Sequence, residues 1–209
     1  MRRGLTRVGK VALAIGLVCA AAASTASAKA VTKAQTFDQC VSVNSQIADH
    51  GTTSESVFVN VPKNGKKPQP GTVTGFSIVG TRITHTFAGD LTLTLVSPAG
   101  KAAALAIQRG DGEEDGYGSG AASCTGSLLQ FGDSFGAPIA SAIGTGDDPL
   151  TGQFRPEQPL SSLVGGPVRG FWTLVVEDCC TDDVGSLNAF SLSFTYSFKK
   201  PARKKKGGR

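Results

Sequence analysis

The residues best suited to nucleophilic catalysis lie in the segment FGDSFGAP, where Gly132-Asp133-Ser134-Phe135-Gly136 fits the pattern G-x-S-x-G. With His50 or His85 upstream, the chain also has the order His, Asp, Ser of a serine protease. A serine nucleophile of this kind stands on a turn from a strand into a helix, and Ala137-Pro138 continues this chain without a helical pattern. We therefore predict a surface loop, and keep a small serine hydrolase or peptidase using Ser134 as an alternative.

Two other groups of side chains could do chemistry, and the first is acidic. Asp178, Asp182 and Asp183 follow the apolar run FWTLVVE, and Asp90 stands at the start of another apolar segment. Ca²⁺ takes roughly six to eight oxygen ligands, which carboxylates and loop carbonyls supply. If the fold brings these four residues to one rim, they form a calcium site, which is the cofactor we predict. The alternative is that these aspartates only form turns.

The second group is the cysteines, whose interpretation depends on the compartment. Residues 1–28 have a basic start, a short apolar run and the small-residue end Ala26-Ser27-Ala28, which predicts a secretory signal peptide and an extracellular or envelope location. Cysteines of exported proteins pair as disulfides. Adjacent cysteines rarely bridge one another, so we expect each member of the adjacent pair to have a different partner, in either order. The four disulfide cysteines are Cys40, Cys124, Cys179 and Cys180. A zinc site is disfavoured, since neither histidine lies near a cysteine in the sequence.

The charge of the chain is unevenly distributed. Four of its 21 basic residues lie in 1–28 and seven in 199–209, which leaves ten basic residues against all 16 acidic ones in 29–198. The body of the protein is therefore acidic, and the net charge of +5 gives no reason to expect specific nucleic-acid binding. The basic residues of the C-terminal segment are Lys199, Lys200, Arg203, Lys204, Lys205, Lys206 and Arg209. We predict a disordered tail that binds anionic polymers of the cell surface.

These candidate residues must be positioned by strands, because apolar and polar residues alternate with a period of two. In SLNAFSLSFTYSF, the residues from Phe190 to Phe198 alternate with serine and threonine, and DLTLTLV and SVFVNV behave alike. FWTLVVE is a continuous apolar run, which predicts a strand covered on both faces. TVTGFSIVGTRITHTF predicts one or two strands interrupted near Gly75 or Gly80, and KAAALAIQ fits a helix or a strand.

The fold class predicted from this pattern is all-β, with a sandwich or jelly roll as architecture. We expect a signal peptide over 1–28, an N-terminal lead-in over 29–50, the β-sandwich over 51–198 and the tail over 199–209. No segment after the signal peptide is long and apolar enough to span a membrane.

Three segments in order, ITHTFAGDLTLTLVSPAG, LTGQFRPEQPLSSLVGG and GFWTLVVEDCCTDDVGSLNAFSLSF, resemble the P domain (Homo B domain) of the proprotein convertases. The resemblance covers roughly Val57 to Phe198 and is nearest to the bacterial copies in secreted proteins. It implies a jelly-roll β-sandwich similar to galactose-binding domains. In convertases this domain follows a subtilisin-like catalytic domain, is needed for its folding and stability, and is not catalytic.

We therefore expect a secreted, non-catalytic module that binds or stabilises a partner protein or attaches to the cell surface. His85 shares strand parity with Ile83 and Phe87, which predicts a hydrogen-bonded structural histidine. A carbohydrate-binding jelly roll is a second alternative. It would show exposed aromatic platforms, whereas Trp172 and Tyr196 are expected in the core and only Tyr117 lies in a predicted loop.

Overall fold

The computed structural model describes residues 31–64, 67–110, 115–143, 146 and 148–200. The predicted signal peptide and tail residues 201–209 lie outside this part. In the described part, every regular element is a strand or a short 3₁₀ turn, and no helix is long and apolar enough to cross a membrane. The elements are β1 Val31–Ile47, β2 Thr52–Val59, β3 Lys63–Asn64, β4 Lys67–Pro68, β5 Gly71–His85, η1 Ala88–Asp90, β6 Leu91–Val96, β7 Ala102–Ile107, β8 Gly116–Tyr117, β9 Leu129–Phe131, β10 Ala137–Pro138, η2 Ile139–Ser141, β11 Gln153–Arg155, η3 Leu160–Leu163, β12 Gly170–Asp178 and β13 Gly185–Lys200.

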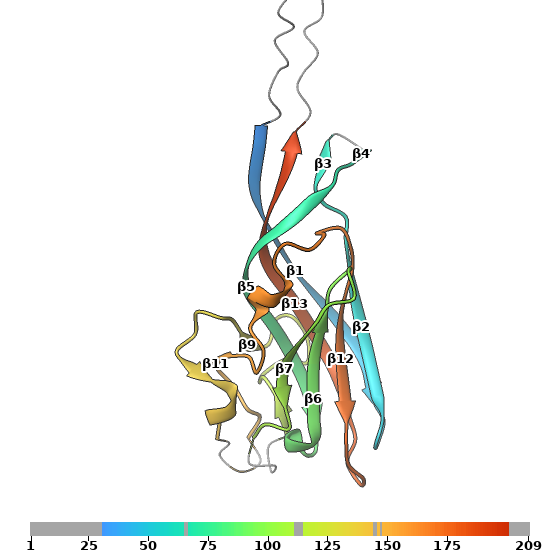
Figure 1. Cartoon of the computed structure of the whole chain (residues 1–209). Helices are drawn as coiled ribbons and strands as arrows, with labels where there is room; N and C mark the ends of the chain where they lie inside the picture. The colour runs from blue at the N-terminus through green and yellow to red at the C-terminus, as the bar shows by residue number, and fades with distance from the viewer. Residues whose placement is uncertain (1–30, 65–66, 111–114, 144–145, 147, 201–209) are drawn as a thin grey trace, which may run out of the picture.

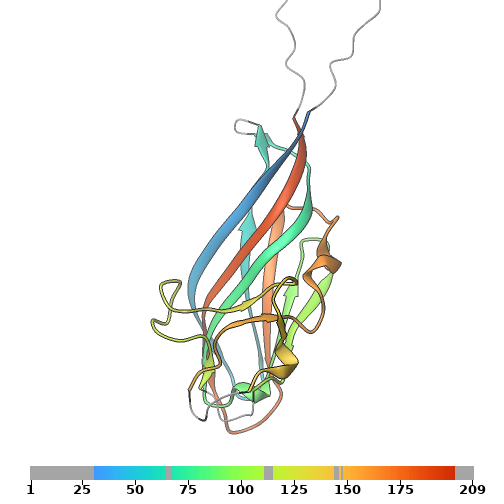
Figure 2. The same cartoon turned by 90° about the vertical axis from the view of Figure 1, so that its left-hand side faces the viewer.

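Two sheets pack face to face, which confirms the predicted all-β sandwich (Figure 1). One sheet has seven strands in the order β1-β13-β5-β9-β11-β10, with β8 beside β5, and the other has four in the order β2-β12-β6-β7. Turned by 90°, the molecule shows β1, β13 and β5 lying side by side along the length of the first sheet (Figure 2). Both described ends of the chain lie at the upper end, and the loops around η1 lie at the opposite end (Figure 1).

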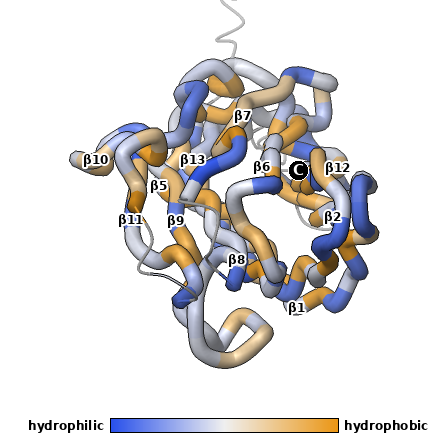
Figure 3. Tube along the Cα trace, turned by 90° about the horizontal axis from the view of Figure 1, so that it is seen from below, coloured by the Kyte–Doolittle hydropathy of each residue, from blue (hydrophilic) through white to orange (hydrophobic). Residues whose placement is uncertain are grey.

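The core is built from the predicted inward row of β13. Phe190, Leu192, Phe194, Tyr196 and Phe198 are all buried. The ring of Phe194 lies between the two sheets, with centroid distances of 5.3 Å to Trp172 of β12 and 5.6 Å to Phe76 of β5. Seen from the lower end, apolar and polar stretches alternate along the chain in both layers, as sandwich strands with one buried face require (Figure 3).

The first strand begins where a lead-in was expected. Residues 29–50 were predicted to precede the sandwich, but Val31–Ile47 is β1 and pairs with β13 along its whole length. Most side chains of β1 are at least partly exposed, so the segment lacks the strong apolar alternation that marks the other strands. Its partner β13 supplies the hydrogen bonds, and a local sequence pattern does not reveal such a partner.

Strand β12 is covered on one face only, so the prediction of two covered faces is wrong. Trp172, Leu174 and Val176 are buried, whereas Phe171, which precedes Trp172 and points to the opposite face, is 62% exposed. The two neighbours of β12 in its sheet are β2 and β6, and among the described residues no further layer covers the outer face at Phe171. The apolar run reflects a half-buried strand whose outer positions are also apolar.

The two ambiguous segments are both strands. KAAALAIQ forms β7, and TVTGFSIVGTRITHTF runs through Gly75 and Gly80 as the single strand β5, with irregular register against β13. A Cβ atom on Gly80 would lie 2.5 Å from Oγ of Ser191 and 3.0 Å from Cδ1 of Leu128. Glycine at this position therefore lets the loop carrying Leu128 approach the outer face of the sheet.

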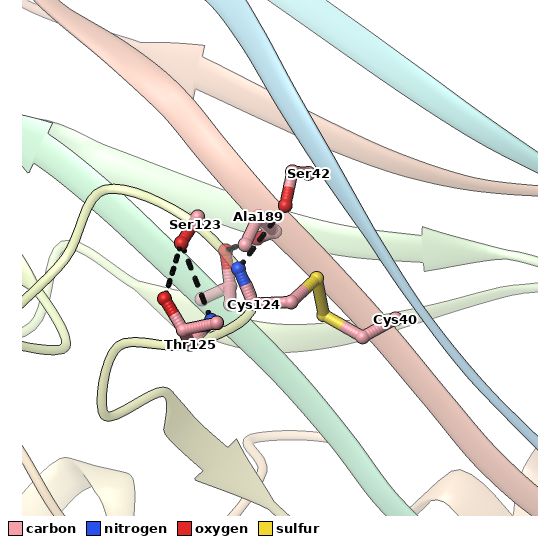
Figure 4. Close-up of a disulfide and its surroundings, with 7 residues drawn as sticks. Cys40, Ser42, Ser123, Cys124, Thr125 and Ala189 are labelled. Carbon is pink, nitrogen blue, oxygen red and sulfur yellow. Dashed lines mark hydrogen bonds between the residues drawn. A yellow bond between two sulfur atoms is a disulfide. The ribbon is translucent and has the colours of Figure 1, made fainter.

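That loop, residues 118–128, is held to the sheet by a disulfide (Figure 4). Cys124 is bonded to Cys40 of β1, and the backbone N–H of Cys124 donates to Oγ of Ser42 at 3.2 Å. Ser119 and Ser127 exchange two backbone hydrogen bonds of 2.8 Å, which close the base of the loop. The bridge spans 84 residues, so the chain-entropy model gives it a stabilisation of about 4–5 kcal/mol.

The expected disulfide pairing is wrong, because the structure also joins Cys179 to Cys180. Cys40 is opposite Ser191 on β13, six residues from Gly185 at the lower end where the adjacent pair lies. At about 3.3 Å per residue this is ~20 Å, and a disulfide needs Cα atoms within about 7 Å. Cys40 therefore reaches only Cys124, and the adjacent cysteines have only each other.

We predict that replacing Cys40 and Cys124 together by serine lowers the free energy of unfolding by about 2–5 kcal/mol, because the bridge constrains a long segment of the unfolded chain. Limited proteolysis should then cut within 118–128. Urea unfolding followed by tryptophan fluorescence measures the first effect. The matched control is Cys179→Ser with Cys180→Ser, which opens a bridge between neighbours in sequence and should cost much less. Equal losses for the two double variants would contradict the prediction.

Candidate functional site

The lower rim of the sandwich gathers the ends of several strands. β5 ends at His85 and β12 at Asp178, while β6 follows η1 there and β13 starts at Gly185. In the ladders, Asp178 is opposite Leu91 and Gly185 is opposite His85. The segment between β12 and β13 therefore runs directly beside η1. We call His85, Asp90, Asp178, Cys179 and Cys180 the rim cluster.

His85 and Asp178 form the buried floor of the rim cluster. Nε2 of His85 lies 3.5 Å from Oδ2 of Asp178, and neither side chain is accessible to solvent. The Nδ1 atom of His85 lies 3.0 Å from the carbonyl oxygen of Phe87 and 3.2 Å from the backbone nitrogen of Phe87. These two contacts with the main chain fix the orientation of the imidazole ring. The other oxygen of Asp178 accepts the backbone N–H of Cys180 at 3.1 Å. The prediction of a structural, hydrogen-bonded His85 agrees with this geometry.

Asp90 lies above this floor. Its backbone carbonyl accepts the N–H of Cys179 at 3.2 Å, and the residue is 9% exposed. Burial raises the pKa of the Asp90 carboxyl, and the negative charges of Asp178 and Asp183 raise it further, while His85 acts in the opposite direction. The carboxylate is therefore held in an environment that disfavours its own charge and favours a cation or a proton beside it.

The Cys179–Cys180 disulfide lies partly exposed at the same place. The side-chain amide of Gln108 donates to Sγ of Cys179 at 2.8 Å, and the backbone N–H of His50 donates to the carbonyl of Cys180 at 3.1 Å. His50 is thus next to the cysteines in space, although it is far from them in sequence. Because the bridged residues are adjacent, the chain-entropy model assigns the bond only about 1 kcal/mol.

The four predicted calcium ligands differ in their burial and in the protein groups that their carboxylates contact. Asp90, Asp178 and Asp183 are close enough to influence one another electrostatically. Oδ1 of Asp183 accepts a hydrogen bond of 2.5 Å from Thr86, and Asp182 is exposed in the same loop. Both oxygens of Asp178 already face protein groups, one toward His85 and one toward Cys180. Calcium binding by these residues stays a prediction, for which Asp90 and Asp183 are the better placed ligands.

The serine-hydrolase alternative finds no support in the geometry around Ser134. Ser134 is exposed, but the carboxylate of Asp133 accepts the backbone N–H groups of Leu160 and Ser161 at 2.7 and 2.8 Å, which anchors the start of η3. The ring of His85 is buried against Asp178. Asp133 and His85 are therefore committed to other contacts, and the backbone of the other candidate, His50, is bonded to Cys180 at the rim.

The aromatic residues considered for sugar stacking are all buried. Trp172 and Tyr196 lie in the core as predicted, and Tyr117 is also buried, contrary to its expected loop exposure. The hydroxyl oxygen of Tyr117 lies within hydrogen-bonding distance of the carbonyl oxygens of Ala88 and Arg109, at 3.0 and 2.7 Å, and donates its one hydrogen to this pair. None of these three rings forms a platform for a glycan.

The sequence analysis missed an aromatic pair on the outer face of the four-stranded sheet. Phe58 of β2 and Phe171 of β12 are direct cross-strand neighbours with ring centroids 4.9 Å apart, and they are 43% and 62% exposed. The guanidinium of Arg169 lies 5.3 Å from the centroid of the Phe58 ring. The sequence could have revealed this pair, because successive side chains of a strand point to opposite faces. With Trp172 in the core, Phe171 must point outward.

The described part of the basic C-terminal segment lies at the opposite end from the rim. Lys199 is exposed on β13, as are Lys33 of β1 and Lys63 and Lys67 of the β3–β4 hairpin nearby (Figure 1). The remaining predicted tail residues, Arg203, Lys204, Lys205, Lys206 and Arg209, lie outside the described residues. Positive charge is therefore concentrated at the upper end.

We predict that Asp90→Asn stabilises the protein at neutral pH. The folded-state pKa of Asp90 is raised above its unfolded value, so ionisation costs stability as the pH rises through this interval, and the cost is complete above the folded pKa. The variant should be the more stable protein at pH 7, and the difference should vanish as the pH falls below about 4. Urea unfolding in chelator tests this, with exposed Asp38→Asn on β1 as control. A wild type more stable than Asp90→Asn at pH 7 would refute the argument.

Comparison with known proteins gives a family match inside the sandwich. Residues 77–126 match the model of the proprotein convertase P-domain. Among solved structures, the chain is similar to the complex of an Aeromonas sobria serine protease and a chaperone, at 16% identity and TM-score 0.47, and to the serine protease of Aeromonas sobria, at 18% identity and TM-score 0.45. Each alignment covers 81% of this chain and 28% of that chain, so this protein spans less than a third of those chains.

No curated protein matches the chain. The matched family is an accessory domain of subtilisin-like proteases and not their catalytic domain. The predicted resemblance to the P domain of the proprotein convertases is therefore confirmed by the family match over residues 77–126.

Proposed function

We propose that the protein is a secreted, non-catalytic P-domain-like module that binds and stabilises a partner protein through the outer face of its four-stranded sheet. The observation that carries this proposal is the exposed pair Phe58 and Phe171 with Arg169 beside it. Aromatic residues and arginine are enriched in the centres of protein interfaces, where they contribute most of the binding energy.

The surroundings of the aromatic pair suit a protein partner. The next outward cross-strand pair, Ser56 and Thr173, shares a hydrogen bond of 2.8 Å between its hydroxyl groups. Further outward positions on β6 are Thr92 and Thr94, and Val96 continues the row. The outward positions between Phe171 and Glu177 on β12 carry no charge, so a partner that covers them removes little solvation energy.

A second element of the proposal is attachment to an anionic surface polymer by the upper end. Exposed Lys33, Lys63, Lys67 and Lys199 converge there, and the chain continues into the basic residues of 201–209. Attraction of this kind depends on the number of charges rather than on a shaped site, so it weakens with added salt.

The aromatic pair is tested by the double variant Phe58→Ser with Phe171→Ser. We expect the affinity for the partner to fall by about tenfold or more, since residues at interface centres commonly contribute above 1 kcal/mol each. The partner is first identified by a photo-crosslinking residue placed at position 175 of the exported chain, which lies on the same outward face of β12, two outward positions from Phe171. Affinity is then measured by surface plasmon resonance. Ile143→Ser, which removes another exposed apolar side chain, is the control and should bind normally.

Full affinity of the double variant for the crosslinked partner would overturn the docking surface. Failure to crosslink any protein from the producing organism's envelope and secreted fractions would overturn the proposed function itself. Circular dichroism distinguishes either result from loss of the fold.

For the upper end, we expect a chain shortened after Lys200 to bind an anionic polymer such as a teichoic acid or heparin more weakly than the full chain, because five positive charges are lost. Retention of the full chain should fall as salt is raised. A chain of full length with glutamine at these five positions controls for tail length and should behave like the shortened one. Equal retention of all three proteins at low salt would contradict a role of the tail.

A further inference from the structure

The rim cluster brings together ligand atoms for a metal site that differs from the predicted calcium site, because two of its ligands are sulfur atoms. A carboxylate oxygen of Asp90 and the sulfur atoms of Cys179 and Cys180 all lie within 4.8 Å of one another. While the two sulfurs are bonded to each other they are poor ligands. As thiolates they are the strongest soft ligands that a protein offers.

The bond between the two sulfurs is in a position to be opened. It links neighbours in sequence, so it constrains the unfolded chain very little and its opening costs the fold little stability. Both cysteines are partly exposed at the end of the molecule, where a reductant in solution can reach them. The Cys40–Cys124 bridge, in contrast, holds a loop onto the sheet.

The surroundings favour negative sulfur once the bond is open. The amide of Gln108 already donates toward Sγ of Cys179 at 2.8 Å, and a donor in this position stabilises a thiolate. The nearby carboxylate of Asp90 opposes a second negative charge, and a bound cation removes this conflict. His50, whose backbone is bonded to Cys180, carries an exposed imidazole at the same rim.

We propose that reduction of Cys179–Cys180 creates a site for a thiophilic divalent cation of the Zn²⁺ and Cd²⁺ class, with Cys179, Cys180 and Asp90 as ligands. An external dithiol supplies two electrons and two protons, so that the protein disulfide becomes two thiols and the dithiol becomes a disulfide. The cation then displaces the two thiol protons to water. Water completes the coordination, and thiolate sulfur with a carboxylate is a ligand set that suits zinc.

This inference is independent of the proposed docking surface, and it gives the rim two exclusive states. In the oxidised protein, the carboxylate oxygens of the rim remain available, which suit hard cations such as Ca²⁺. In the reduced protein, the same Asp90 joins two thiolates and the preference passes to soft cations. The redox state of one bond thereby selects the class of metal ion that the protein holds.

The experiment titrates Cd²⁺ into the full exported chain after mild reduction with a water-soluble phosphine that is then removed. Alkylation and mass spectrometry count the free thiols and assign them to Cys179 and Cys180. Ultraviolet absorption from thiolate to cadmium charge transfer reports binding, and circular dichroism reports the fold. We expect one Cd²⁺ per reduced chain, no such absorption in the oxidised chain, and displacement of Cd²⁺ by excess Zn²⁺ but not by Ca²⁺.

Variants then test the ligands. Cys179→Ser with Cys180→Ser should abolish the absorption, including under conditions that also open Cys40–Cys124. Asp90→Asn should weaken binding by about tenfold or more, as loss of even an outer-shell partner has effects on this scale. Asp38→Asn, on an exposed face of β1, is the matched control and should bind normally. In the oxidised chain, a Ca²⁺ titration of the same variants examines the predicted oxygen-ligand site.

The proposal is overturned if the folded, reduced chain with two free thiols at 179 and 180 binds no stoichiometric Cd²⁺. It is also overturned if binding survives the double serine variant or is unaffected by Asp90→Asn. Reduction of Cys40–Cys124 under conditions that leave Cys179–Cys180 intact would refute the premise that the rim bond opens first.

Discussion

The contact on which the rest of the structure depends is the packing of β13 against the opposite sheet at Phe194. β13 pairs with both β1 and β5, and its aromatic side chains meet Trp172 of β12 between the layers. A register shift of one residue would turn serine and threonine into the core and the aromatic row outward. The inward row therefore fixes which residues end at the rim and which face of β12 is free.

The sequence predicted the features that this alternation encodes. The inward face of β13, the core position of Trp172 and the all-β class follow from side chains two residues apart, a spacing that a strand makes local. Strand β1 was missed because its side chains are mostly exposed and its order comes from hydrogen bonds to a strand about 150 residues later. The exposure of Phe171 depends likewise on the absence of a covering layer.

At the rim, too, the features that depend on local sequence were predicted, whereas those that depend on contacts between distant segments were not. That Asp90 and the segment after β12 could meet at one rim followed from their positions at strand ends, and the hydrogen bond from Cys179 to Asp90 places them together. The cysteine pairing did not follow, because it depends on how far along β13 each cysteine lies. Two other facts also required coordinates: Asp133 caps η3 instead of serving Ser134, and His50 adjoins Cys180.

The separation of charge along the molecule affects how the protein orients near a charged surface. Lysines crowd the upper end with both described ends of the chain, whereas Asp90, Asp178 and Asp183 lie at the lower end (Figure 1). Such a molecule has a permanent electric dipole along its long axis, and the field above a polyanionic layer turns it before contact. It would land upright, with the outer ends of β1 and β13 toward the layer and the rim with its disulfide farthest from it. The faces of the two sheets would then be open to neighbouring molecules at the sides.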